Sequence, residues 1–217
     1  MMFRALLLFL AIASTAHAGA WPRGKGNGFA MVSFQVTASG LGGPVSYYTG
    51  SFVEYGLTDK LTLGSDVGHG VSGSSKALIF ISYPIGVIND KHRFAAEIGV
   101  GRIAGNTVVR PGFNYGRGIK NRFGEGWVTL DTLFEHHLGE GHTDVKLDFT
   151  FGLNHGRGFK SMLQLQAGKQ RGDPGFLRLA PSFAMPIGQK MHFELGFSSS
   201  LRGPSEYGIK AGVWRKF

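Results

Sequence analysis

The chain has 217 residues, no cysteine and a formal net charge of +9, and 17% of its residues are charged. Ordinary soluble domains carry about 25% charged residues, and a chain without cysteine cannot rely on a disulfide framework. Glycine is abundant, at 35 residues, but follows no collagen-like period. These features favour a protein held together by ordinary packing or by closed backbone pairing.

Residues 1–18 have the layout of a secretory signal peptide. Arg4 precedes the apolar run 5–13, and small residues follow up to Ala18. An Ala-x-Ala site is also present at Ala20, so cleavage after Ala18 and cleavage after Ala20 both fit. Loss of Arg4 lowers the formal charge from +9 to +8. The apolar run is too short for a membrane-spanning helix, which needs roughly 20 residues. The mature chain is therefore either exported and soluble or crosses a membrane as strands.

Residues 19–27 form a short polar lead, and residues 28–217 consist of alternating runs separated by turn residues. Runs of about ten residues with this alternation are typical of transmembrane β-strands. In 143–153, for example, valine, leucine and phenylalanine alternate with aspartate, lysine and threonine. The predicted strands are 28–38, 45–56, 61–70, 76–84, 92–102, 107–115, 126–135, 143–153, 159–168, 176–185, 191–200 and 205–217.

Three details of these strands are less regular. The run 76–84 is apolar on both faces, so its orientation stays open. Pro111 removes a ladder hydrogen bond, which predicts a bulge there. The segment 116–125 is rich in glycine and basic residues and is predicted to be the longest turn on its side.

The faces opposite the apolar stripes carry a mixed, slightly acidic set of charges, which includes Asp144. Opposite charges that face one another across a lumen tend to pair. This pattern predicts a narrow or charge-filled interior and argues against a wide anion-selective pore, which would need a ring of basic residues. The predicted lumen network consists of Glu54, Asp66, Arg93, Glu97, Arg110, Asp131, Glu135, Lys146, Asp148, Arg178, Glu194 and Lys210.

The run 205–217 resembles the last strand of bacterial outer-membrane β-barrel proteins, which alternates and ends in phenylalanine as an assembly signal. The matching positions are Tyr207, Ile209, Val213 and Phe217. Two residues depart from the pattern: Arg215 stands where an apolar residue is usual, and Trp214 lies one position away.

The mature lead, Ala-Trp-Pro-Arg-Gly-Lys-Gly at 20–26, resembles that of a group of small proteobacterial outer-membrane barrels. The fold implied is all-β: a closed antiparallel up-and-down transmembrane barrel of about 12 strands, within about 10–14. The location implied is the outer membrane of a Gram-negative bacterium. The implied partners are the barrel assembly machinery, outer-membrane lipid and lipopolysaccharide. The oligomeric state stays open.

A soluble β-sandwich or lipocalin-like barrel would also alternate, but its polar face would carry more lysine and glutamate. We therefore expect a membrane barrel that acts as a narrow passive channel for small solutes or as a structural membrane protein. The alternative is a lipid-modifying enzyme, because lipid A deacylases and the outer-membrane phospholipase resemble this chain in size and architecture. Those enzymes pair a histidine with a serine; here His69 and Ser72 are nearest, but His69 falls on the predicted lipid face. We expect no enzymatic activity.

The segment 135–144 places three histidines and three carboxylates on one outward hairpin. Its spacing matches no established metal pattern, so we interpret it as an exposed polar tip and expect neither metal nor cofactor. Nucleic acid is not expected as a partner of an exported chain. The candidates for aromatic girdles at the membrane interfaces are Trp127, Trp214, Tyr47, Tyr55, Tyr115 and Tyr207.

Overall fold

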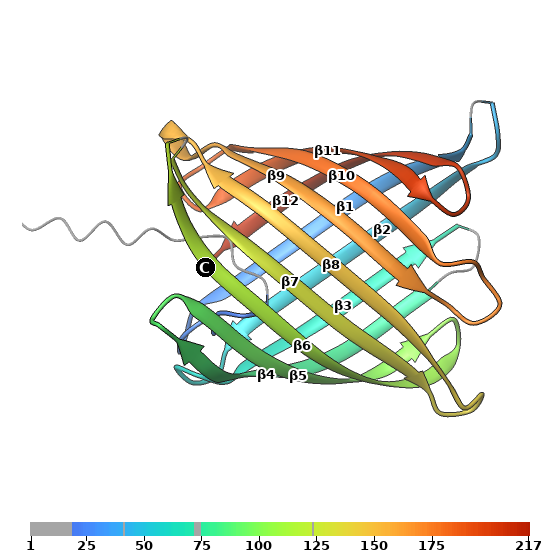
Figure 1. Ribbon diagram of the computed structural model, residues 1–217, viewed down its shortest axis with the longest axis horizontal. Helices are drawn as coiled ribbons and strands as arrows, with labels where there is room; N and C mark the ends of the chain where they lie inside the picture. The colour runs from blue at the N-terminus through green and yellow to red at the C-terminus, as the bar shows by residue number, and fades with distance from the viewer. Residues whose placement is uncertain (1–18, 41, 72–74, 123) are drawn as a thin grey trace, which may run out of the picture.

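Twelve antiparallel strands close into one barrel in the computed structural model, which describes residues 19–40, 42–71, 75–122 and 124–217. Each strand pairs with its neighbours in sequence, and the first pairs with the last (Figure 1). This confirms the predicted fold class. The strands are β1 (Gly28–Ser39), β2 (Val45–Gly56), β3 (Thr62–Gly70), β4 (Ser75–Ile88), β5 (His92–Ile103), β6 (Asn106–Asn121), β7 (Gly124–His137), β8 (His142–Asn154), β9 (Lys160–Lys169), β10 (Phe176–Pro186), β11 (Met191–Arg202) and β12 (Glu206–Lys216), with a 3-10 turn η1 (Gly156–Gly158) before β9. Within the described ranges, no helix is long and apolar enough to cross a bilayer.

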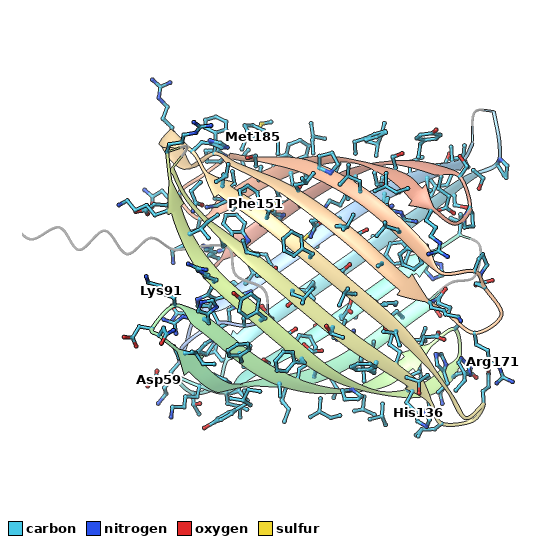
Figure 2. The ribbon with its side chains drawn as sticks, viewed as in Figure 1. Asp59, Lys91, His136, Phe151, Arg171 and Met185 are labelled. Carbon is cyan, nitrogen blue, oxygen red and sulfur yellow. The ribbon has the colours of Figure 1, made fainter. Side chains whose placement is uncertain are left out.

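The outer wall of the barrel is apolar and its inner wall is polar, as the alternation predicts. In β8, Phe149 is 39% exposed on the outside, whereas its neighbour Thr150 is 6% exposed inside. Figure 2 shows side chains projecting from the wall all around the barrel, with Phe151 on the wall and Asp59, Lys91, His136 and Arg171 at the two ends. An apolar belt between polar ends, with every strand paired, is the arrangement that a bilayer requires.

The orientation of β4, left open by its sequence, follows from packing inside the barrel. Leu78 and Phe80 are buried, at 2% and 3% exposure, while Ile79 and Ile81 face outward. The Phe80 ring lies over Gly64 of β3, where a methyl group would stand 2.1 Å from Phe80 Cζ. A side chain at Gly64 would collide with the ring, so the glycine makes room for an inward phenylalanine.

Two predicted irregularities lie elsewhere than expected. The β5–β6 register runs without a shift across Pro111, so the predicted bulge there is wrong. Register shifts occur instead between Pro84 and Gly86 and between Leu177 and Arg178. Pro111 pairs with Ile98 of β5, but the pairing of β6 with β7 is interrupted at Arg110 and Pro111 and resumes in the same register at Gly112. The missing N–H of proline is tolerated where the ladder is interrupted.

The predicted long turn at 116–125 is also wrong. Strand β6 continues to Asn121 and β7 begins at Gly124, so the two form an extended hairpin. Glycine and basic residues made this segment look like a loop, yet Gly116 and Gly118 pair in register with β7.

The C-terminal end of the chain lies at one end of the barrel, drawn on the left in Figure 1 and called here the inner end. Gly28 N donates to Phe217 O at 2.7 Å and Phe217 N donates to Gly28 O at 3.0 Å, which closes the β1–β12 seam there. The three-residue turn between β4 and β5, residues 89–91, has Asn89 and Asp90 at positive φ, 51° and 55°. Positive φ at these two successive positions suits the twist of a hairpin. The opposite end is called the outer end.

Candidate functional site: the charged lumen

A four-residue ion network crosses the wall of the lumen from β3 to β6. Arg110 Nη1 lies 2.7 Å from Asp66 Oδ2, and Arg110 Nη2 lies 3.3 Å from Glu97 Oε1. Lys76 Nζ lies 2.8 Å from the other oxygen of Asp66. The Arg110 side chain is only 2% exposed, and its guanidinium lies 5.5 Å from the centre of the Phe80 ring. Arg110 thus depends on two carboxylates for its stability, since burying an unpaired guanidinium costs several kcal/mol.

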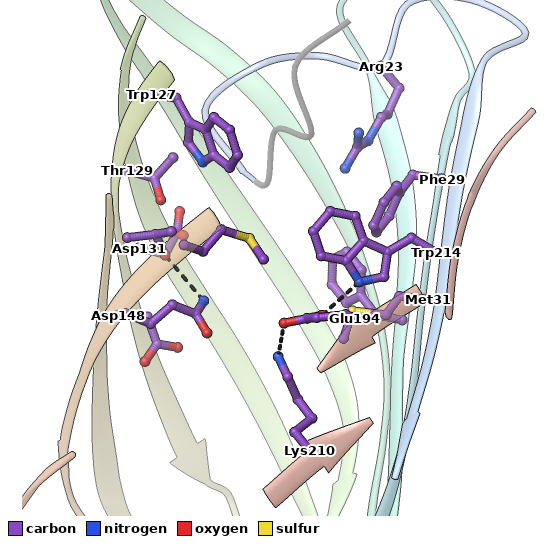
Figure 3. A pocket seen from close by; sticks show the side chains of 14 residues that line it. Arg23, Phe29, Met31, Trp127, Thr129, Asp131, Asp148, Glu194, Lys210 and Trp214 are labelled. Carbon is purple, nitrogen blue, oxygen red and sulfur yellow. Dashed lines mark hydrogen bonds and ion pairs between the residues drawn. The ribbon is translucent and has the colours of Figure 1, made fainter. Parts of the chain in front are cut away.

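Two further ion pairs join neighbouring strands elsewhere on the lumen wall. Glu135, 1% exposed, accepts a hydrogen bond at Oε1 from Lys146 Nζ at 3.0 Å, between β7 and β8. Glu194 Oε1 lies 2.6 Å from Lys210 Nζ, and Trp214 Nε1 donates to Glu194 Oε2 at 2.7 Å. These contacts bring β11 and β12 together inside the barrel, as Figure 3 shows.

Near the outer end, Arg178 Nη2 on β10 reaches Glu206 Oε2 on β12 at 2.6 Å. Sequence reasoning missed Glu206, although it is four residues from Lys210 in the same strand and therefore faces the same side. Lys76 was missed because β4 is apolar on both faces. These two residues add charges of both signs to the predicted set.

Three members of the predicted network stand outside the ion pairs of the described residues. Asp131 and Asp148 face each other across the β7–β8 register. Asp131 Oδ1 is buried and has no hydrogen-bond partner in the described part of the chain. Arg93 lies on the inner face of β5 opposite Gly116, close to the inner end, and none of the ion pairs formed by described residues includes it.

The lead, residues 19–27, folds into the inner end of the barrel. Arg23 bonds Glu54, with Arg23 Nε donating to Glu54 Oε2 at 2.7 Å, and Arg23 N donates to Thr62 Oγ1 at 3.1 Å. Ala20 is 1% exposed. The Trp21 ring lies on Gly116, where a methyl group would stand 2.1 Å from Trp21 Cζ3. No periodic pattern in the sequence points to this docking.

The lead also continues the sheet at its inner end. Gly26 N donates to Gly56 O, and Gly56 N donates to Asn27 O, both at 2.9 Å. Lys25 N lies 3.3 Å from Asp59 Oδ1 in the turn after β2. These backbone contacts fix the direction in which the lead enters, so the lead narrows the inner half of the lumen.

Three neighbouring cavities occupy the lumen along its axis. The outer one, ≈ 420 Å³, and the middle one, ≈ 220 Å³, share Lys76 and Lys146 as lining residues. The middle one and the inner one, ≈ 280 Å³, share Asp131 and Asp148. The shared residues show that the cavities adjoin. The lumen therefore contains adjoining cavities between its inward side chains and is not a solid core.

The inner cavity is partly aromatic. Trp127 and Trp214, 2% and 6% exposed, line it from opposite sides, with Arg23 close to them (Figure 3). The prediction that both tryptophans belong to the interfacial girdles is therefore wrong. Their parity could have shown this, because Trp127 alternates in step with Asp131 and Trp214 in step with Lys210. The remaining girdle candidates alternate in step with the outward-facing residues of their strands; they are Tyr47, Tyr55, Tyr115 and Tyr207.

No family model and no curated sequence matches the chain. Among solved structures, NanC porin matches with a TM-score of 0.65 at 10% identity, covering 87% of this chain and 100% of that one. The chain is similar in fold to small outer-membrane porins. KdgM porin gives a TM-score of 0.63 at 10% identity, covering 86% of this chain and 99% of that one. The COG4313 outer membrane channel from Pseudomonas putida F1 gives 0.58 at 10% identity, covering 91% and 98%.

The histidine-rich hairpin is not a simple exposed tip. His137 and Asp144 are each 5% exposed, and the His137 and His142 rings stack with centroids 4.4 Å apart. Asp144 accepts Arg171 N at 2.9 Å, which joins the hairpin to the loop after β9. His137, His142 and Asp144 each offer a ligand atom within 4.8 Å of the others, so these residues could hold a divalent cation. The expectation of no metal stays a prediction.

The alternative enzymatic site gains no support from the geometry. His69 is exposed on the outer face of β3, as predicted, and Ser72 lies outside the described residues. Another pair, His155 Nε2 and Ser161 Oγ, stands 2.8 Å apart at the inner end. A nucleophilic serine also needs a group that orients the histidine. Among the contacts of the described residues, none orients His155 in this way.

The predicted assembly-signal residues lie on the outer face of β12. Tyr207, Ile209 and Phe217 are 41%, 62% and 43% exposed, and Val213 shares their parity. Arg215 falls on the same face, while Trp214 points inward, which accounts for the departure from the usual pattern.

Proposed function

We propose that this protein is an outer-membrane β-barrel that acts as a narrow passive channel for small solutes. The observation that carries the proposal is the row of adjoining cavities through a lumen of mixed charge. The fold, shared with solved porins, supports it. Such a lumen would pass small polar solutes while excluding larger ones.

The inner half of the lumen sets the limit of permeation. The lead and the Glu194–Lys210 pair occupy this inner half. Trp127 and Trp214 line the inner cavity there. If the lead stays in place, the barrel is closed and serves as a structural membrane protein, which is the second candidate function. The same geometry thus favours a small or intermittent conductance over a large steady one.

Single-channel recording in a planar bilayer tests the proposal. We expect small conductance steps with weak ion selectivity, because cations and anions both meet charges of both signs. A large, stable, anion-selective conductance would contradict the proposal. A folded, heat-modifiable barrel that conducts nothing would favour the structural role instead.

The proposed setting is the outer membrane, with the inner end in the periplasm. Exposed basic side chains stand at the outer end and suit the phosphates of lipopolysaccharide. They include Arg102, Lys169, Arg171 and Arg202. We further propose that the outer face of β12 with Phe217 is recognised by the barrel assembly machinery. A Phe217→Ala variant should then lower the yield of assembled barrel in cells without changing refolding in detergent.

A further inference from the structure

Asp131 on the lumen wall, like its neighbour Asp148, forms no ion pair among the described residues. Asp131 has Asn114 beside it on β6 and a second carboxylate, Asp148, beside it on β8. Glu97, also nearby, already binds Arg110. Asp131 Oδ1 is buried without a hydrogen-bond partner in the described part of the chain. A lone carboxylate is costly to bury, so this position calls for a cation.

The start of the lead lies directly on this carboxylate. A methyl group built on Gly19 would stand 2.7 Å from Asp131 Oδ1 and 2.7 Å from Asn114 Cγ. The oxygen of Gly19 lies 3.5 Å from Ser82 Oγ on the neighbouring wall. The next residue, Ala20, is 1% exposed. Gly19 is thus held deep inside the lumen, and its nitrogen is bonded to the Cα atom from which this methyl group would project towards Asp131.

We propose that cleavage after Ala18 makes Gly19 the mature N-terminus and that its α-ammonium group is the counter-ion of Asp131. In the reaction, water hydrolyses the Ala18–Gly19 amide: the carboxylate leaves with the signal peptide, and the amine stays on Gly19 and is protonated. An α-amine is largely charged at neutral pH. The unprocessed chain has an uncharged amide at this position, so the ion pair forms only after processing.

The alternative cleavage, after Ala20, does not fit this site. It would remove Gly19, the residue of the lead that contacts Asp131, together with the buried Ala20. Cleavage after Ala18 keeps both residues and adds a positive charge next to Asp131. The inference therefore selects between two sites that the sequence left open, and it holds whether or not solutes pass through the lumen.

The test combines mass spectrometry with amine labelling of the mature protein purified from outer membranes. Intact mass and N-terminal sequencing should give Gly19 as the first residue. An acylating reagent at neutral pH should label the α-amine of the folded barrel about tenfold more slowly than that of the urea-unfolded chain. The reason is that the ion pair lowers the fraction of free, reactive amine by about a factor of ten. Asp131→Asn should remove this protection in the folded state. Asp90→Asn, in an exposed turn, should not.

A mature protein that begins at Trp21 would overturn the proposal. So would an α-amine that reacts equally fast in the folded wild type and the folded Asp131→Asn variant. Should that variant fail to give a heat-modifiable barrel, the comparison of folded with unfolded wild type decides alone, and equal rates there reject the ion pair.

Discussion

Lys210 Nζ lies 2.6 Å from Glu194 Oε1 inside the barrel, close to the seam that joins the last strand to the first. The other oxygen of Glu194 accepts Trp214 Nε1 at 2.7 Å. The carboxylate is 2% exposed, so it depends on these two donors. The pair links β11 to β12 by side chains in addition to the backbone ladder.

Replacing Lys210 should therefore destabilise the barrel. For Lys210→Met we expect a loss of about 3 kcal/mol in the free energy of unfolding, because the buried carboxylate keeps only Trp214. The urea midpoint of unfolding in detergent measures it. The double variant with Glu194→Gln should recover part of the loss, because no unpaired charge remains. Lys60→Met, in an exposed turn, is the control and should leave the midpoint unchanged.

The outer and inner faces of β8 should respond oppositely to a new charge. Phe149→Arg places a cation on the lipid face, at a cost of about 2–4 kcal/mol near the bilayer midplane, and should block assembly. Thr150→Arg points into the lumen next to Asp148 and should assemble. The fraction of protein that runs as the heat-modifiable folded form reports the outcome. Equal loss in both variants would contradict the face assignment.

Two glycines of β6 provide a matched test of the lead as a constriction. A methyl group at Gly116 would collide with the Trp21 ring, whereas one at Gly118 would meet nothing within 4 Å. Gly116→Ala should displace the lead and raise the single-channel conductance, while Gly118→Ala should leave it at the wild-type value. If both variants conduct like the wild type, the lead does not set the conductance.

Lys76 should contribute to ion selectivity. It lines both the outer and the middle cavity and pairs with Asp66 at 2.8 Å. Removing its charge in Lys76→Gln leaves the lumen more acidic and should shift the reversal potential in a KCl gradient towards cation preference. The control is Arg102→Gln. Arg102 pairs with Ala77, the residue next to Lys76, but lies outside the lumen, so this variant should cause no shift in the reversal potential.

Strand positions and faces could be predicted because each strand must satisfy lipid on one side and a polar lumen on the other. Apolar and polar residues therefore alternate with a period of two along the sequence, most clearly in β8. The pattern failed where both faces are apolar, as in β4, because only the fit of Phe80 over Gly64 fixes the orientation.

Ion pairing within the lumen followed less directly from the sequence. Parity placed Glu194 and Lys210 on one face, but which charges meet depends on register across separate strands, which a single sequence does not give. The tryptophans were assigned from the usual enrichment of this residue type at membrane interfaces, although their own parity pointed inward. The lead has no strand period, so nothing in its sequence revealed that Arg23 would reach Glu54.

The β1–β12 seam joins residues from opposite ends of the polypeptide, with Gly28 and Phe217 exchanging two backbone hydrogen bonds. Contacts so distant in sequence carry a large loop-closure entropy and form late and slowly. Until they form, β1 and β12 present unpaired edges that invite association with other chains. Before the barrel closes, these edges are therefore the part of the chain most exposed to aggregation.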